Sequence, residues 1–281
     1  MRIIYTMFLL FISFYGFSQL KTPSASTASE IEQVVGLTEI EVDYNRPSKR
    51  GRVIFGNLVP FGKIWRTGAN SGTEISFSTD VSINGENINE GTYSIFSIPN
   101  EDSWQIIFYS DIDLWSVPRN WEESKIIFQS NFKSNTNNKV VETFSISFED
   151  ITNNNVNLVF SWDDTNVIVP IDVPTKSLVE DQIKSIMGDD PKSSDYYSAA
   201  VYYLQENINL DIALKWMNKA IEMIENPRFF QLRQQSLILA ANGQYKNAIK
   251  VAEKSLELSI QANNGDYVKM NNDSIEEWSK M

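Results

Sequence analysis

The spacing of the apolar residues changes close to Pro170 and Pro174, and this change constrains the fold more than any other feature of the chain. Upstream of these prolines, short runs rich in Val, Ile, Phe, Thr and Trp alternate with turn residues, as in antiparallel β-sandwiches and barrels. Downstream, apolar residues recur every three or four positions, as on one face of an α-helix. We therefore expect two domains in this chain of 281 residues, an all-β domain followed by an all-α domain.

The upstream half predicts a meander of antiparallel strands that forms a β-sandwich or a barrel-like domain. From Glu39 to Tyr44, apolar and acidic residues alternate, which gives a strand one buried and one solvated face. Asn84-Gly85 lies between two short apolar runs and favours the positive φ angles of a tight hairpin. The polar stretch at 131–138 has no apolar period and predicts a solvated loop.

The downstream half predicts paired helices that resemble tetratricopeptide repeats. Ala213 and Ala248 hold equivalent places in two helical patterns and lie 35 residues apart, close to the tetratricopeptide period of about 34 residues. Before them, an apolar face near 178–187 stops at Gly188 and indicates a short linker helix. A last amphipathic stretch at 266–280 predicts the terminal helix that caps such a stack.

The first 18 residues follow the order of a secretory signal peptide. Arg2 precedes an apolar run over 3–14, and small or polar residues then lead to a cleavage site before Gln19. The apolar run is shorter than the roughly 20 residues that span a bilayer, and the chain has no cysteine to carry a lipid anchor. We therefore expect an exported protein, periplasmic or secreted, with no membrane span.

These patterns divide the chain into five segments. Each boundary falls where the apolar period changes or where prolines and polar residues interrupt it. The predicted boundaries are 1–18 for the signal peptide, 19–30 for a flexible N-terminal segment, 31–173 for the β-domain, 174–194 for a linker with a short helix, and 195–281 for the tetratricopeptide-like helical domain.

The composition excludes most familiar catalytic chemistry. The chain contains no cysteine and no histidine, which removes disulfides, thiolate and imidazole metal ligands, and every nucleophile or triad that depends on them. Its formal net charge of −12 repels phosphate backbones and anionic lipids. We predict no metal, no cofactor, no nucleic-acid partner and no catalytic residues, so an enzyme is the less favoured interpretation.

The least regular segment, residues 44–74, mixes cationic and aromatic side chains with turn formers. It contains the block IFGNLVPFGKIWRTGAN at 54–70, and GTYSIFSIP at 91–99 and WQIIFY at 104–109 follow it. In these blocks the chain resembles the exported bacterial family called domain of unknown function 2911, and the resemblance covers about 31–173. Because that family has no established activity, the resemblance implies no catalytic or binding residues.

Candidate ligand-binding residues gather in and around this segment. They are Trp65, Arg66, Asn70, Phe61, Arg46, Arg52 and Glu74. Arg66 provides a planar fork of donors for a carboxylate, and Trp65 or Phe61 provides a ring that stacks on a sugar. Alternatively, Arg66 pairs with Glu74 or Asp43 while Trp65 fills the core. The arginines at 46–52 form either a partner-binding patch or a solvated loop.

Three functional hypotheses follow from these observations. The leading one is a non-enzymatic exported envelope protein that acts as an adaptor, with the helical repeat binding an unidentified protein or peptide. The second is a β-domain that binds a small ligand or a glycan, with Trp65, Arg66 and Asn70 at the mouth of the site. The third, less favoured, is a glycoside hydrolase that uses carboxylates, because these are the common acid–base groups left in the chain.

Overall fold

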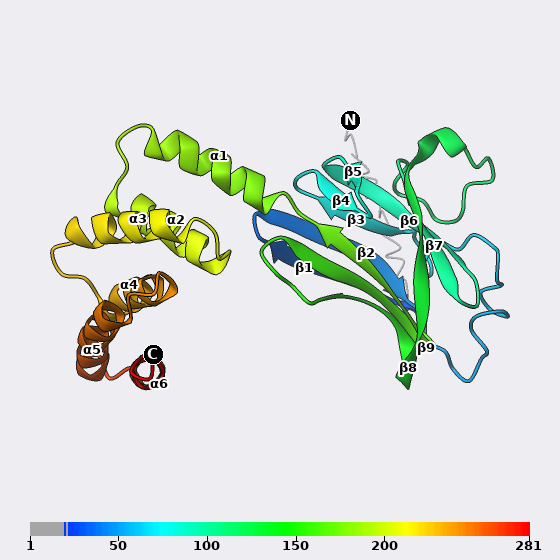
Figure 1. Ribbon diagram of the computed structural model, residues 1–281. Coiled ribbons are helices and arrows are strands. Elements are labelled where there is room, and N and C mark those ends of the chain that lie inside the picture. The colour runs from blue at the N-terminus through cyan, green and yellow to red at the C-terminus, as the bar shows by residue number, and fades with distance from the viewer. Residues whose placement is uncertain (1–19, 21) are drawn as a thin grey trace, which may run out of the picture. The chain divides into compact units, whose positions relative to one another are not determined.

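The computed structural model describes residue 20 and residues 22–281, which divide into two compact units after Thr175. The first unit is an antiparallel β-domain, and the second is helical (Figure 1). This confirms the predicted all-β domain followed by an all-α domain. The predicted signal peptide and its cleavage site lie outside the described residues. Within the described part, no helix combines the length and the apolar character needed to cross a bilayer.

The described part of the β-domain contains nine strands in one antiparallel sheet, with the order β1-β2-β3-β6-β7-β8-β9-β4-β5. The strands are β1 Thr27–Val35, β2 Thr38–Arg46, β3 Thr73–Phe77, β4 Val81–Ile83, β5 Glu86–Ile88, β6 Gly91–Pro99, β7 Ser103–Tyr109, β8 Ile126–Glu149 and β9 Asn155–Asp172. Among these strands, β1 and β5 form the two edges, so the sheet is open and is not a closed barrel.

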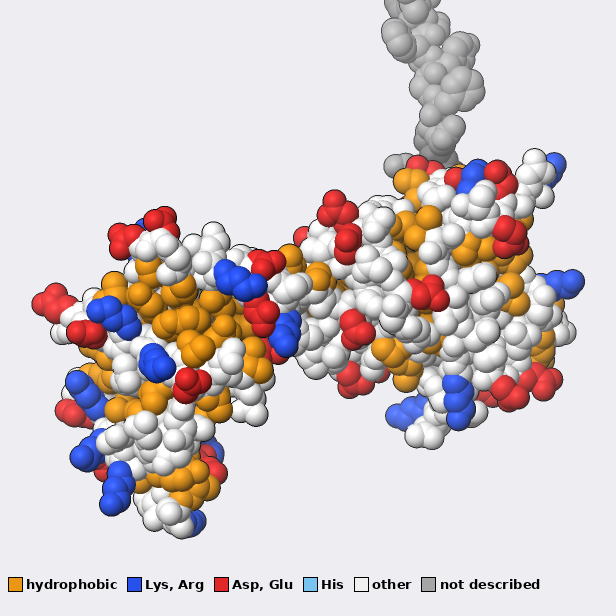
Figure 2. Space-filling view, turned by 45° about the horizontal axis from the view of Figure 1, so that its top comes forward, with side chains coloured by type: hydrophobic (Ala, Val, Ile, Leu, Met, Phe, Trp, Pro, Cys, Tyr) orange, Lys and Arg blue, Asp and Glu red, His pale blue; other side chains and the backbone are white. Residues whose placement is uncertain are grey.

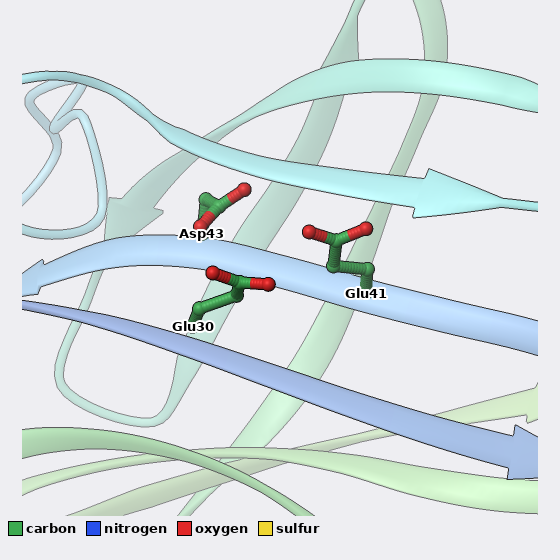
Figure 3. Close-up of side chains that lie close together, drawn as sticks. All are labelled: Glu30, Glu41 and Asp43. Carbon is green, nitrogen blue, oxygen red and sulfur yellow. The ribbon is translucent and has the colours of Figure 1, made fainter.

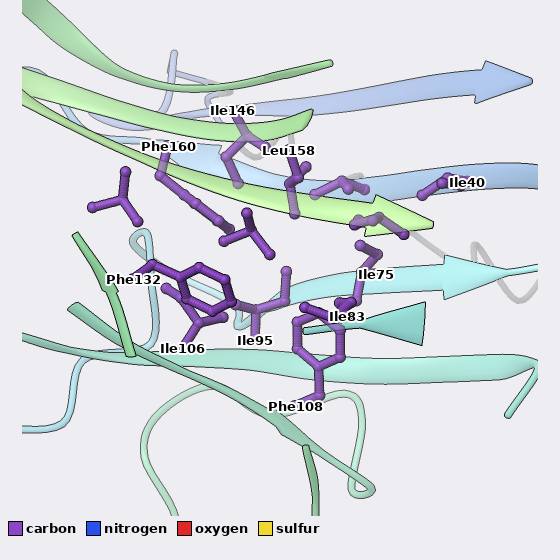
Figure 4. Close-up of a cluster of buried hydrophobic side chains, with 14 of the residues drawn as sticks. Ile40, Ile75, Ile83, Ile95, Ile106, Phe108, Phe132, Ile146, Leu158 and Phe160 are labelled. Atoms are coloured by element: carbon purple, nitrogen blue, oxygen red, sulfur yellow. The ribbon is translucent and has the colours of Figure 1, made fainter. Parts of the chain in front are cut away.

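The sheet folds over on itself because β8 belongs to both of its halves. The first residues of β8 pair with β7, and its later residues pair with β9. The result is two layers of strands around one hydrophobic core (Figures 1 and 4). Tyr44 joins the layers, because its hydroxyl donates to the carbonyl of Ile146 at 3.2 Å and accepts from the Ile146 amide at 3.0 Å.

The alternating strand predicted at 39–44 is confirmed within β2. Ile40, Val42 and Tyr44 are buried, and the acidic residues between them face outward. Ile40 lies between the layers with isoleucine and phenylalanine side chains from other strands (Figure 4). A slip of one residue would expose this apolar set to water, so the alternation fixes the register of β2.

The predicted hairpin at Asn84-Gly85 is also confirmed. These two residues join β4 to β5, and their φ angles are 52° and 81°. Positive φ angles at both central positions match the twist of the flanking strands. Val81 and Ile88 consequently face each other across the hairpin and are both buried.

Two stretches without an apolar period are nevertheless strands. Residues 131–138 do not form the predicted loop but lie within β8, where Asn135 pairs with Asn166 of β9. Strand β1 begins at Thr27, inside the segment predicted to be flexible, because residues 27–30 pair with the end of β2. In both places backbone hydrogen bonds to a neighbouring strand hold polar residues in the sheet, and such bonds leave no signal in the apolar pattern.

The helical unit contains α1 Thr175–Met187, α2 Ser193–Gln205, α3 Leu210–Glu222, α4 Phe229–Ala241, α5 Tyr245–Gln261 and α6 Gly265–Trp278. From α2 to α6, each helix packs against the next. Ala213 in α3 and Ala248 in α5 are both fully buried, so their small side chains lie where helices approach closely. The expected linker helix corresponds to α1 and the expected terminal helix to α6, whereas the assignment to tetratricopeptide repeats stays a prediction.

Candidate functional site

A pocket of about 400 Å³ in the β-domain is rich in arginine, and we call it the arginine pocket. Its lining consists of Ala25, Ser26, Pro47, Ser48, Arg50, Arg52, Leu58, Val59, Ile64, Trp65, Arg66, Gly68, Ala69, Val117 and Trp162. Arg50, Arg52 and Arg66 supply the charged groups of this lining, and no carboxylate belongs to it. The pocket therefore combines positive charge with an apolar wall.

Two tryptophans line the arginine pocket, Trp65, which is half-buried, and Trp162, which is almost fully buried. The rings of Trp65 and Trp162 lie 5.9 Å apart with an interplanar angle of 21°. Trp65 also contacts the edge of Phe144 in the hydrophobic core, and its indole nitrogen donates to the carbonyl of Gly68 at 3.0 Å. Trp65 thus belongs to both the core and the pocket, and its core contacts fix the position of the ring that the pocket presents.

The pocket arginines donate to backbone carbonyls. Arg50 donates to Ala25 at 2.9 Å, Arg52 donates to the carbonyls of residues 48 and 49, and Arg66 Nη1 donates to Trp115 at 2.9 Å. Every ion pair within 4.0 Å among the described side chains uses a lysine, so none of these three arginines forms an ion pair, and the Glu142 carboxylate accepts from the backbone amide of Arg50 at 2.7 Å. The Nε atom of Arg66 is buried without a hydrogen-bond partner. The pocket therefore keeps both uncompensated charge and an unused donor.

The structure brings some of the predicted site residues together. Trp65, Arg66 and Arg52 line the arginine pocket. Asn70 does not line it, but its side-chain amide donates to the carbonyl of Ser26, a lining residue, at 3.1 Å. Asn70 adopts a φ of 56° in this loop. Its contact fixes the start of β1 beside the pocket.

The remaining predicted residues lie elsewhere. Phe61 is 37% exposed and lines no part of the arginine pocket. Arg46 donates to a backbone carbonyl of β8 at 3.0 Å. Glu74 accepts from the amide of Asp113 at 2.6 Å, and neither Glu74 nor Asp43, the two alternatives, forms an ion pair with Arg66 within 4.0 Å.

A second pocket, of about 470 Å³, carries the opposite charge, and we call it the acidic pocket. Its lining consists of Ala28, Ser29, Glu30, Asp43, Tyr44, Asn45, Ser71, Gly72, Glu74, Asp113 and Trp115. Glu30, Asp43 and Glu74 form one row across the outer face of three strands, because Glu30 pairs with Asp43 and Asp43 pairs with Glu74. Like charges placed directly opposite each other weaken strand pairing.

The acidic face extends to Glu41, which lies next to this row. One carboxylate oxygen from each of Glu30, Glu41 and Asp43 lies within 4.8 Å of the other two (Figure 3), the one such trio of acidic side chains among the described residues. Burial and then the charges of Asp43 and Glu30 raise the pKa of Glu41. Burial and the charge of Glu30 likewise raise the pKa of Asp43. Ionisation of Glu41 and Asp43 is therefore less favourable in the folded protein than in the unfolded chain.

We expect Glu41→Gln to stabilise the protein at pH 7 by about 0.2–1 kcal/mol, the usual range for a cross-strand pair. A carboxyl group with a raised pKa binds its proton more tightly in the folded chain, so it destabilises the fold as pH rises above its ordinary pKa of 4.5. This gain in the free energy of unfolding should disappear below about pH 4, because the carboxyl group of Glu41 is then protonated in both the folded and the unfolded chain. Urea denaturation at pH 7 and pH 3.5 measures the gain at each pH. Glu253→Gln, an exposed helical control, should show no such pH-dependent gain.

Sequence reasoning did not assign Trp162, Val117 or Ala25 to the site. These residues come from distant parts of the chain, and only the folded sheet brings them to the arginine pocket. The acidic row was also missed, although the alternation in residues 39–44 already predicts an acidic outer face. Strand register, which the sequence does not provide, was the missing information.

Comparison with known proteins assigns the β-domain to a family. The family model described as "Protein of unknown function (DUF2911)" matches residues 26–171. The chain belongs to this family. The match confirms the resemblance seen in residues 54–70 and includes nearly all of the lining of both pockets, so these pockets are features of the DUF2911 domain, while α1 to α6 lie beyond it. No curated protein and no solved structure matches the chain.

Proposed function

We propose that the β-domain binds a small organic anion in the arginine pocket, namely a carboxylate attached to an apolar group or a sugar ring. The observation that carries this proposal is the set of three pocket arginines without a carboxylate partner. Surface arginines in a protein with a net charge of −12 have many carboxylates to pair with. These three lie instead around a concave site whose volume is in the range of small-molecule pockets, about 300–1,000 Å³.

The pocket chemistry favours a carboxylate with an apolar body. Guanidinium groups donate to carboxylates in a planar, bidentate geometry, and such charge-assisted hydrogen bonds are stronger than neutral ones. The buried Nε of Arg66 needs an acceptor, because an unsatisfied buried donor is unfavourable. Trp65, Ile64 and Val117 supply the apolar surface that contacts the rest of the ligand. This supports the second of the three hypotheses.

The proposal also covers where the protein acts and what its helical unit does. The order of regions in residues 1–18 supports export to the periplasm or beyond the cell. Hydrophobic side chains gather on one face of the helical unit (Figure 2), and an apolar groove of about 240 Å³ lies between α1 and α2. An adaptor role would use such a surface. The arginine pocket supports ligand binding more directly, because its charges specify the chemistry of the occupant.

Thermal denaturation with matched probes tests the proposed ligand class. N-acetylleucine and glucuronate carry a carboxylate, whereas N-acetylleucinamide and glucose are their neutral counterparts. We expect an anionic probe to raise the melting temperature progressively with its concentration, because a ligand that binds only the folded state stabilises it by RT ln(1 + L/Kd), where L is the free ligand concentration. We expect Arg66→Met to weaken this binding by about 10- to 100-fold, because a hydrogen bond to a charged group contributes about 1.5–3 kcal/mol.

Arg119→Met provides the matched control for Arg66→Met. Arg119 is exposed and lines neither pocket, so its loss removes the same charge from the protein without altering the site. Binding of the anionic probes should therefore remain as in the unaltered protein. Equal binding of the anionic and neutral probes, or equal binding before and after Arg66→Met, would overturn the proposed function.

A further inference from the structure

The arginine pocket and the acidic pocket adjoin each other. Residues 25–26 line the arginine pocket and residues 28–30 line the acidic pocket, so one segment passes from the first to the second. Three further segments also contribute to both linings. The chain passes from one lining to the other between Asn45 and Pro47, between Ala69 and Ser71, and between Trp115 and Val117. Because a residue spans at most about 3.3–3.6 Å, the linings of the two pockets come within about two residue lengths of each other along these segments.

The acidic pocket lacks a cation of its own. Glu30, Asp43 and Glu74 face one another across three strands, and no lysine or arginine lies within 4.0 Å of them among the described side chains. Self-repulsion makes this row unfavourable for the fold. Beside it lies a pocket with three uncompensated arginines, so the two sites present opposite charges to anything that spans them.

Polar side chains lie where the linings of the two pockets adjoin. Asn45 donates to the hydroxyl of Ser71 at 2.7 Å, and Asn70 donates to the side-chain oxygen of Asn45 at 3.2 Å. Amide and hydroxyl groups of this kind match the donors and acceptors of a peptide backbone. The exposed indole of Trp115, which lines the acidic pocket, offers a face to an ammonium group.

We infer that the ligand is a dipolar, short peptide whose carboxylate lies among Arg50, Arg52 and Arg66 and whose ammonium group lies among Glu30, Asp43 and Glu74. This inference rests on the proposed function, because it keeps the carboxylate in the arginine pocket and adds a second point of recognition. The separation of the pockets matches a peptide of two to four residues. The apolar wall of the arginine pocket favours an apolar side chain at the carboxyl-terminal residue.

Isothermal titration of the full protein with three peptides tests the inference. Gly-Gly-Leu carries both charges, N-acetyl-Gly-Gly-Leu lacks the ammonium group, and Gly-Gly-leucinamide lacks the carboxylate. We expect Gly-Gly-Leu to bind at least about tenfold more tightly than either analogue, as loss of one charge-assisted contact implies. Asp43→Asn should bring the affinity ratio of Gly-Gly-Leu to its acetylated analogue closer to one, because it removes one of the three carboxylates around the ammonium group.

Glu253→Gln is the matched control for Asp43→Asn. Glu253 is exposed on α5 and lines neither pocket, so its replacement removes the same charge from the protein and the affinity ratio should stay as in the unaltered protein. Equal affinities for Gly-Gly-Leu and its acetylated analogue overturn the dipolar inference, and the proposed function then still stands if Arg66→Met weakens both. Failure of every carboxylate probe to bind overturns both. Calcium binding that Asp43→Asn abolishes, without peptide binding, overturns the inference in favour of a metal ion.

Discussion

Replacement of Trp104 by alanine should lower the free energy of unfolding of the β-domain by about 3–5 kcal/mol, the range for removal of a buried aromatic side chain. Trp104 is fully buried in β7. Its ring lies 4.9 Å from that of Phe55 and 5.9 Å from that of Trp65. The substitution removes these contacts and leaves a cavity that the rigid strands cannot close.

Urea denaturation followed by tryptophan fluorescence and circular dichroism measures this loss, and Trp115→Ala is the matched control. Trp115 is 75% exposed, so deletion of the same side chain there should change stability by less than about 0.5 kcal/mol. Similar losses for the two variants would contradict the placement of Trp104 in the core. Because Trp65 packs against Trp104, the core variant should also weaken binding of anionic probes in the arginine pocket.

Gly36→Ala should destabilise the β-domain by about 2–5 kcal/mol, through two separate effects. Gly36 has a φ of 58°, in the left-handed region that disfavours a side chain by roughly 1–2 kcal/mol. A Cβ atom there would also overlap the hydroxyl of Thr175 and the carbonyl oxygen of Asn153. The backbone must move to remove this overlap, and overpacking typically costs about 1–3 kcal/mol.

Gly85→Ala separates the two effects. Gly85 also lies in a hairpin turn and has a φ of 81°, but a Cβ atom there would meet nothing within 4 Å. We expect this variant to lose only the roughly 1–2 kcal/mol of the backbone term. Thermal denaturation of both variants compares them directly. Equal losses would show that Gly36 is required for its backbone conformation alone and that the close approach to Thr175 has no effect.

The sequence predicts those parts of the fold in which side chains carry the signal. The alternation at 39–44 predicts a half-buried strand because every second side chain must leave water. Asn84-Gly85 predicts its hairpin because few other residues adopt the required φ angles. The helices follow from the apolar period after Pro174. Each of these signals is local, so each is visible without knowledge of the fold.

The parts that could not be predicted depend on distant partners. Residues 131–133 of β8 pair with β7 and residues 134–136 pair with β9, and the mostly polar side chains of this stretch do not predict either pairing. The arginines near 46–52 and Arg66 could be chosen as candidates, but their pocket also needs Trp162 and Val117. The acidic row needs the register of three strands. The sequence therefore identifies candidate residues by their type, but it does not show which of them lie together in the folded protein.

The Tyr44–Ile146 hydrogen bonds, which join the two layers of the β-domain, span 102 residues of chain. Such a contact forms only after a long loop has closed, which is entropically unfavourable until the core contacts form around it. The helical unit depends on contacts between neighbouring helices. We therefore expect the two halves of the chain to acquire their structures at different speeds, with the helical half, although synthesised last, reaching its native state first.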